Sequence, residues 1–123
     1  MNRLQLETMT ADQLVECFAA ICLDQAQALL YSDIAKFNRL YESMVEVREE
    51  LKRRPGDERR ALITLYVHEN AQVRLQAARA SFAVAPAAAR RVIEAIANSK
   101  TRPQAGDAGM TISNLDRGIF KPT

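Results

Sequence analysis

The amino-acid sequence predicts an all-α fold, and three observations support that prediction. Alanine, leucine, arginine and glutamate dominate the composition, and these residue types favour helices over strands. Apolar side chains recur every three to four residues in most segments, and no segment shows the two-residue alternation of a strand. Glycine and proline are scarce, at four each. At 123 residues, the chain has the length of one domain.

Two long amphipathic helices are expected first. Thr10 and Gln13 form a capping-box pattern at the start of the first helix, and Ser32 or Asp33 begins the second, which Pro55-Gly56 ends. The first helix has a core stripe of Val15, Phe18, Cys22, Ala26 and Leu29. The second has a core stripe of Phe37, Leu40, Met44, Val47 and Leu51. A short turn joins them, so we expect an antiparallel hairpin.

Four shorter helices follow. The third runs over about residues 57–66, and Asn70 caps a fourth that reaches roughly residue 84. Pro86 lies in the first turn of the fifth helix. Pro103 opens the sixth, and Gly118 is suited to its C-terminal cap.

The last four helices contain an internal repeat. Residues 59–62 match residues 90–93 at an offset of 31, and residues 71–73 match residues 103–105 at an offset of 32. The third and fourth helices therefore form one unit, and the fifth and sixth form a degenerate second unit. The fourth helix has apolar side chains on two sides, which is typical of an inner helix in a stack of helical hairpins.

The best-preserved unit, LITLYVHENAQVRLQAARASF, resembles a HEAT repeat, with a polar turn, Val73-Arg74 and the paired alanines Ala77 and Ala78. Gly106 and Gly109 replace the arginine and the first alanine in the second unit. The chain from residue 9 is similar to an uncharacterised family of small bacterial HEAT/ARM-repeat-like proteins. That resemblance implies an α-α superhelix of about six helices, as three antiparallel hairpins, and no activity. It also implies structural roles for Arg74, which usually pairs with a neighbouring turn, and for both alanines.

The expected domain organisation follows from these elements. Residues 1–8 lack periodicity and are expected to be a disordered or loosely packed extension, and residues 9–123 form a single domain. Within it we expect an N-terminal hairpin (9–54), a first repeat (57–84), a degenerate second repeat (86–118) and a tail (119–123). The tail is expected to fold Ile119 or Phe120 back onto the core.

Composition and residue spacing argue against several classes of protein. The longest uncharged run, residues 80–89, contains a proline, and the N-terminus lacks the apolar stretch of a signal peptide. We therefore expect a cytoplasmic protein without a membrane segment. Cys17 and Cys22 would lie about 140° apart on a helix, too divergent to bridge or to share a metal ion.

No catalytic, cofactor or metal site is expected, and the sequence is interpreted as a non-enzyme. His68 is a lone histidine in a turn, without a Cys, Ser or Asp constellation for acid–base catalysis. The glycine-containing run 105–109 lacks the lysine of a phosphate-binding loop. The carboxylates of the second helix lack the Glu-x-x-His elements of paired-metal sites.

Two charged surfaces are candidate interaction sites. Residues 1–50 hold nine acids and four bases, a net charge of −5, and residues 51–123 hold six acids and thirteen bases, a net charge of +7. In the second half, arginines could form an arginine ridge for acidic proteins or phosphates: Arg53, Arg54, Arg59, Arg60, Arg90 and Arg91. In the first half, Glu42, Glu46 and Glu49 could form an acidic face. A solvated helix surface is the competing interpretation of both.

The sequence thus favours a non-enzymatic protein–protein interaction module with an unknown partner. Two alternatives stay open: nucleic-acid-backbone binding through the arginine ridge, and a small bacterial inhibitor or immunity-type protein that uses the acidic face. A homodimer is a further expectation, because the exposed ends of a short helical stack need covering.

Overall fold

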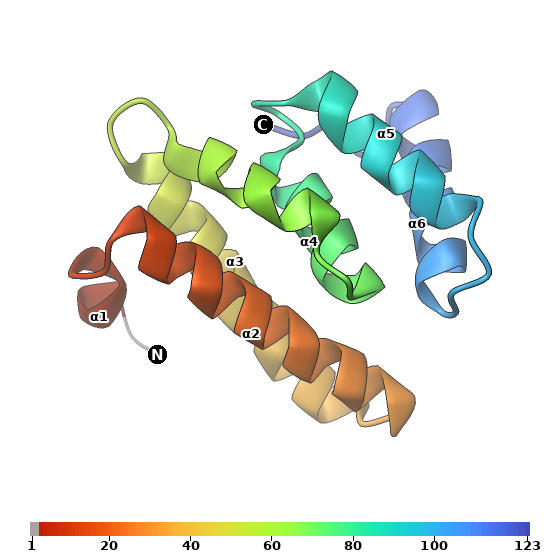
Figure 1. Cartoon of the computed structure of the whole chain (residues 1–123), viewed down its shortest axis with the longest axis horizontal. Helices are drawn as coiled ribbons and strands as arrows, with labels where there is room; N and C mark the ends of the chain where they lie inside the picture. The colour runs from red at the N-terminus through yellow and green to blue at the C-terminus, as the bar shows by residue number, and fades with distance from the viewer. Residues whose placement is uncertain (1–2) are drawn as a thin grey trace. The chain divides into compact units, whose positions relative to one another are not determined.

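The computed structural model describes residues 3–123, and this part of the chain is helical without strands. The elements are α1 (Arg3–Glu7), α2 (Ala11–Leu30), α3 (Ile34–Arg53), η1 (Glu58–Val67), α4 (Ala71–Ser81), α5 (Pro86–Ala97) and α6 (Gln104–Asp116). The predicted all-α fold is confirmed. The chain divides into two compact units, Met1–Ala61 and Leu62–Thr123 (Figure 1).

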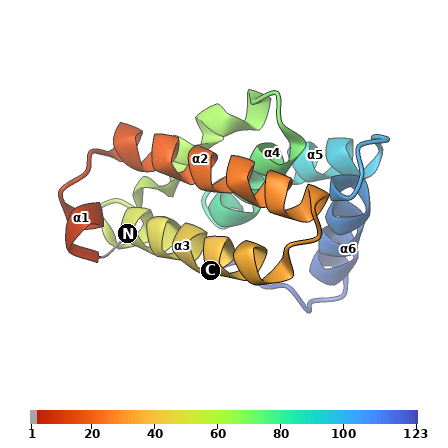
Figure 2. The same cartoon turned by 90° about the horizontal axis from the view of Figure 1, so that it is seen from below.

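The first unit is built on the predicted antiparallel hairpin, in which α2 and α3 lie side by side (Figure 2). Both predicted N-terminal caps form. The Thr10 hydroxyl accepts a hydrogen bond from the Gln13 amide at 3.1 Å, and the Gln13 side chain accepts one from the Thr10 amide at 2.9 Å. Asp33, rather than Ser32, caps α3 by accepting from the Lys36 amide. The core side chains of α2 and α3 include Leu14, Phe18, Cys22, Met44, Val47 and Leu51.

The expectation of a disordered or loosely packed segment over residues 1–8 is wrong for its described part. Arg3–Glu7 form helix α1, and the Leu6 side chain is only 1% exposed. Arg54 donates hydrogen bonds to the carbonyl oxygen of Leu6 within this helix, at 3.1 Å, and to that of Met9 just after it, at 2.6 Å. Five residues are too few to give a recognisable periodicity, so tertiary contacts organise this helix. Met1 and Asn2 lie outside the described residues.

The third predicted helix forms as a 3₁₀ helix, η1, rather than an α-helix. Its buried side chains, Arg59, Leu62 and Leu65, are spaced by three residues, which is the period of a 3₁₀ helix. The boundary between the two units follows Ala61 and thus falls inside the segment 57–84 assigned to the first repeat. A single domain over residues 9–123 stays a prediction.

The second unit packs α4, α5 and α6 around an apolar cluster. Its buried side chains are Leu75, Ala78, Ala89, Ile93, Ile96 and Ala108. Helix α4 ends at Ser81 rather than residue 84, and nine of its eleven residues are buried, as its two apolar sides predicted. Pro86 occupies the first turn of α5, and Gly118 follows α6 with φ +71°, as expected.

The C-terminal tail folds back through Phe120. Its ring centroid lies 6.5 Å from that of Phe82, whereas Ile119 is exposed. Gly106 and Gly109 are exposed on α6, so neither provides the close helix packing that glycines can permit. The predicted HEAT-like superhelix stays a prediction.

Candidate functional site

The arginines at the end of α3 are held by a buried carboxylate. Glu50 is 5% exposed and accepts hydrogen bonds from Arg53 at 2.8 Å and from Arg54 at 2.9 Å. Because Arg54 also donates to the carbonyl oxygens of Leu6 in α1 and of Met9 just after it, the Glu50–Arg54 pair fastens the N-terminal segment to α3. Glu50 thus pairs with a residue one helical turn later, whereas the neighbouring Glu49 pairs with Arg48 at 3.1 Å.

The electrostatics of this cluster favour the charged carboxylate. Burial by itself would raise the pKa of Glu50, but the hydrogen bonds and positive charges of Arg54 and Arg53 outweigh it and lower that pKa. The cluster therefore contributes to the stability of the first unit and offers little unpaired positive charge.

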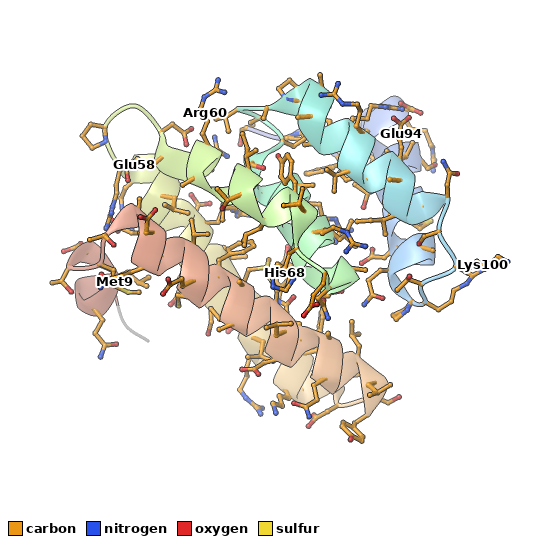
Figure 3. The ribbon with its side chains drawn as sticks, viewed as in Figure 1. Met9, Glu58, Arg60, His68, Glu94 and Lys100 are labelled. Atoms are coloured by element: carbon orange, nitrogen blue, oxygen red, sulfur yellow. The ribbon has the colours of Figure 1, made fainter. Side chains whose placement is uncertain are left out.

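Arg59 is likewise held inside the first unit. Its guanidinium donates to both carboxylate oxygens of Asp57, at 2.7 to 3.2 Å, and its side chain is buried. These hydrogen bonds lower the pKa of Asp57. Arg60, the next residue, is exposed and extends away from the ribbon (Figure 3).

In the second unit, Arg90 joins α5 to the end of α6. It pairs with Asp116 at 2.9 Å and with Glu94 at 3.4 Å. The hydrogen bonds from Arg90 lower the pKa of Asp116. Arg91 is exposed on α5.

Of the predicted arginine ridge, Arg60 and Arg91 are therefore exposed without an ion pair in the described chain, whereas the other four arginines bind carboxylates. Arg60 belongs to the first unit and Arg91 to the second. A continuous ridge across both units stays a prediction.

The acidic face lies on the outer side of α3. Glu42 and Glu46 are exposed and one helical turn apart, and Glu49 is half-buried beside Arg48. The structure thus places the three predicted carboxylates on one side of a single helix, although Glu49 is partly neutralised.

The residues expected to be structural are held in place by the packing of the second unit. Ala77 and Ala78 are fully buried in α4. Arg74 donates to the carbonyl oxygens of His68 at 2.7 Å and Glu69 at 3.0 Å. Arg74 therefore closes the turn before its own helix, whereas the resemblance implied a pairing with a neighbouring turn. The His68 ring accepts a hydrogen bond from the Asn70 amide at 3.0 Å, which also fixes this turn.

Residues 3–123 hold no candidate metal site and no helix suited to span a membrane. No group of three or more histidine, cysteine, aspartate or glutamate side chains could hold a metal ion within this part of the chain. None of the helices described is long and apolar enough to cross a membrane. Cys22 is buried, with its Sγ 3.8 Å from Met44 Sδ, and no disulfide joins Cys17 to Cys22.

The structure also exposes an apolar surface that was not expected from the sequence. Large side chains gather near the turn of the hairpin, and we name this set the apolar hairpin face: Leu23, Leu30, Tyr31, Ile34 and Tyr41. Leu30, Tyr31 and Ile34 are each more than 70% exposed. Large apolar side chains grouped in this way mark interaction sites more often than scattered ones.

A signal for this face is present in the sequence. Leu23 and Leu30 are seven residues apart, as are Ile34 and Tyr41, and these pairs lie off the core stripes of their helices. A seven-residue spacing keeps side chains on one side of a helix, so each pair forms a second apolar stripe.

The comparisons with known proteins agree with the helical fold. A family model described as a domain of unknown function (DUF2019) matches residues 12–116. The crystal structure of the protein RPA1889 from Rhodopseudomonas palustris CGA009 is similar to this chain, with 52% sequence identity and a TM-score of 0.92. The match covers 96% of this chain and 98% of that one. No curated protein matches the chain.

Proposed function

This chain belongs to the DUF2019 family, a bacterial family of unknown function, and we propose that it is a non-enzymatic protein–protein interaction module. The apolar hairpin face is the observation that carries the proposal. Two 20-residue helices hold it in a fixed geometry, so a partner meets a preformed surface and pays little ordering entropy.

A short HEAT-like solenoid is the architecture that we propose for this module. In the second unit, Gln72 of α4 and Gln104 of α6 bond to each other and are separated by 32 residues, the offset of the sequence repeat. Stacked repeats bring equivalent positions of successive units together, so this contact supports the proposal. Such solenoids act by presenting surfaces rather than concentrated polar chemistry.

The polar residues that could suggest catalysis have structural partners. His68 and Arg74 both bond within the turn before α4, and Glu50 is occupied by two arginines. These contacts support a non-enzymatic role, because a general base needs a lone pair that faces a substrate. We also propose a cytoplasmic location for this module.

The pairing of the arginines bears on nucleic-acid binding. Arg54, Arg59 and Arg90 bind carboxylates, which reduces the charge available to phosphates. The acidic face remains suited to the inhibitor-type alternative, because Glu42 and Glu46 are exposed. Salt-sensitive retention of duplex DNA that is lost in Arg60→Glu/Arg91→Glu would favour the nucleic-acid alternative over our proposal.

The proposal is tested by capture from a bacterial lysate with matched baits. Leu30→Ser/Ile34→Ser removes the two large aliphatic side chains of the apolar hairpin face, and Val67→Ser removes an equally exposed apolar side chain elsewhere. We expect the wild-type and Val67→Ser baits to retain the same proteins and the double variant to lose them. Equal retention by all three baits would contradict the proposal.

A further inference from the structure

Two matching stripes run along the hairpin, one on each helix. The α2 stripe consists of Glu16, Leu23 and Leu30, and the α3 stripe consists of Ile34, Tyr41 and Arg48. Successive members are seven residues apart in both stripes, so each stripe keeps to one side of its helix. Along each stripe, two apolar side chains lie toward the turn of the hairpin and one charged side chain lies away from it.

Both stripes lie on the same side of the hairpin. Cys22 of α2 contacts Met44 of α3 across the hairpin. Leu23 lies one residue after Cys22, a rotation of about +100°, whereas Tyr41 and Arg48 lie three residues before and four after Met44, rotations of about +60° and +40°. In an antiparallel pair, rotations of the same sense away from the contact lead to the same side, so both stripes face one side of the hairpin.

The levels of the two stripes also match. Cys22 and Met44 are in contact across the hairpin, with their sulfur atoms 3.8 Å apart, and they set its register. Because the helices are antiparallel, residue numbers rise along α2 while they fall along α3 from this contact. The members of the two stripes then lie at the same height along the hairpin at three places: Leu30 with Ile34, Leu23 with Tyr41, and Glu16 with Arg48. Each pair agrees within two residues, a difference of about 3 Å along the axis.

This arrangement is self-complementary in charge. Helix α2 carries the acids Asp12, Glu16 and Asp24 and no lysine, arginine or histidine. The α3 stripe ends in Arg48, and Lys52 follows one turn later. Arg48 is half-buried and pairs with Glu49 of its own helix at 3.1 Å, so an acid of the partner would share its guanidinium with Glu49. A partner for this surface therefore needs apolar side chains opposite both apolar levels and a base opposite Glu16, and Arg48 favours an acid opposite it.

A second copy of the chain meets that requirement. We infer that the α2 and α3 stripes of two copies pack face to face about a twofold axis parallel to the hairpin. This inference rests on the proposed interaction function and names the partner of the apolar hairpin face. In this geometry α2 of one copy lies against α3 of its partner, and every level is preserved. Leu30 then meets the partner's Ile34, Leu23 meets the partner's Tyr41, and Glu16 meets the partner's Arg48.

Other occupants fit this surface less well. A twofold axis perpendicular to the hairpin would place the Leu30–Ile34 level over the Glu16–Arg48 level and bury charge against apolar side chains. An anionic membrane would meet the acids of α2, which carries no base. The resulting four-helix arrangement also follows the ordinary packing of helical bundles.

Sedimentation of the full chain tests the dimer. We expect the wild-type chain and Val67→Ser to dimerise with the same dissociation constant, and Leu30→Ser/Ile34→Ser to raise that constant more than tenfold. The substituted residues are more than 70% exposed, so circular dichroism should report unchanged helix content. A monomeric wild-type chain at high micromolar concentration would overturn the inference, and so would a dimer that the double variant leaves unchanged.

Charge reversal in trans tests the proposed pairing of the two copies. Glu16→Lys alone would place a lysine opposite the partner's Arg48, and Arg48→Glu alone would place a glutamate opposite the partner's Glu16. We expect each variant alone to dimerise more than tenfold more weakly than the wild type. Mixed in equal amounts, they should form a heterodimer of near wild-type affinity, because both of its cross-pairs are attractive. A change within one chain could not produce this rescue, so its absence would overturn the inference.

The inference and the proposed function fail in different ways. A monomeric wild-type chain whose capture of other proteins still depends on Leu30 and Ile34 would overturn the dimer and support the interaction function. Dimerisation that Leu30→Ser/Ile34→Ser weakens would support the second copy as partner. Equal binding of the wild type and this variant to anionic vesicles would exclude a membrane as the occupant of the same face.

Discussion

Gln104 donates a hydrogen bond from its amide nitrogen to the amide oxygen of Gln72 at 3.1 Å, and both side chains are buried. The two residues are separated by 32 positions, the offset at which residues 71–73 match residues 103–105 in the sequence. Arg79 and Thr111 are separated by the same number of residues and also bond, at 2.7 Å. Two residue pairs with this separation therefore join α4 to α6 within the second unit.

The glutamine pair gives the first prediction. Gln104→Leu leaves the Gln72 amide oxygen without this buried donor, and we expect a loss of about 1–3 kcal/mol in the free energy of unfolding. In a double-mutant cycle with Gln72→Leu, the losses should be less than additive, with a coupling of about 0.5–1.5 kcal/mol. Urea denaturation of the four proteins measures both quantities. Strictly additive losses would show that the hydrogen bond contributes nothing of its own.

The hydrogen bonds of Glu50 with Arg53 and Arg54 should make the free energy of unfolding depend on pH. Because the folded protein lowers the pKa of Glu50, its contribution is complete above the unfolded value of about 4.3 and is lost as the pH falls through the lower folded value. Glu50→Gln should cost about 2 kcal/mol at pH 7, and this difference from wild type should shrink below about pH 4. Urea denaturation from pH 7 to pH 3 measures it.

Glu46→Gln is the matched control for that experiment, because Glu46 is exposed on the same helix. Its stability should follow the wild-type curve at every pH. A Glu50→Gln difference that stays constant down to pH 3 would contradict the pairing with Arg53 and Arg54.

Gly109 offers a stabilising substitution. It lies inside α6, and an added Cβ would meet no atom within 4 Å. Gly109→Ala should therefore raise the free energy of unfolding by about 0.5–1 kcal/mol, through reduced entropy of the unfolded chain. Gly118→Ala is the contrasting variant and should destabilise, because Gly118 has φ +71°. Thermal melting shows whether each variant has a higher or a lower melting temperature than the wild type. A lower melting temperature for Gly109→Ala would refute the prediction.

The two thiols should differ in reactivity. Burial raises the pKa of Cys22, whose side chain is fully buried, and raises the pKa of the half-buried Cys17 less strongly. In the native protein at pH 8 we expect a thiol reagent to label Cys22 at least about tenfold more slowly than Cys17. Mass spectrometry of peptides after timed labelling measures both rates. Urea should abolish the difference, and equal rates in the native protein would contradict the buried position of Cys22.

Local chemistry explains which features could be predicted. The Thr10–Gln13 capping box, the Asn70 cap and the position of Pro86 depend on groups within a few residues of one another. The core stripes of α2 and α3 follow from helical periodicity alone. The two-sided burial of α4 was also predictable, because its apolar residues exceed what one face can hold.

Features that depend on distant partners were predicted less well. Helix α1 forms because Leu6 is buried and Arg54, far along the chain, binds its end. The switch of η1 to a 3₁₀ helix depends on burial at three-residue intervals, which its apolar pattern alone does not specify. Among the candidate site residues, Arg54, Arg59 and Arg90 could not be told from Arg60 and Arg91 by sequence.

By itself, then, the sequence determined the helical class and the starts of α2, α4 and α5, because these depend on short-range propensity and periodicity. Only the tertiary structure decided which charges are neutralised and which apolar stripe stays uncovered. A side chain such as Arg90 or Leu30 looks the same in the sequence whether or not a distant helix covers it. Its availability to a partner depends on packing between helices, such as the contact of Arg90 with Asp116.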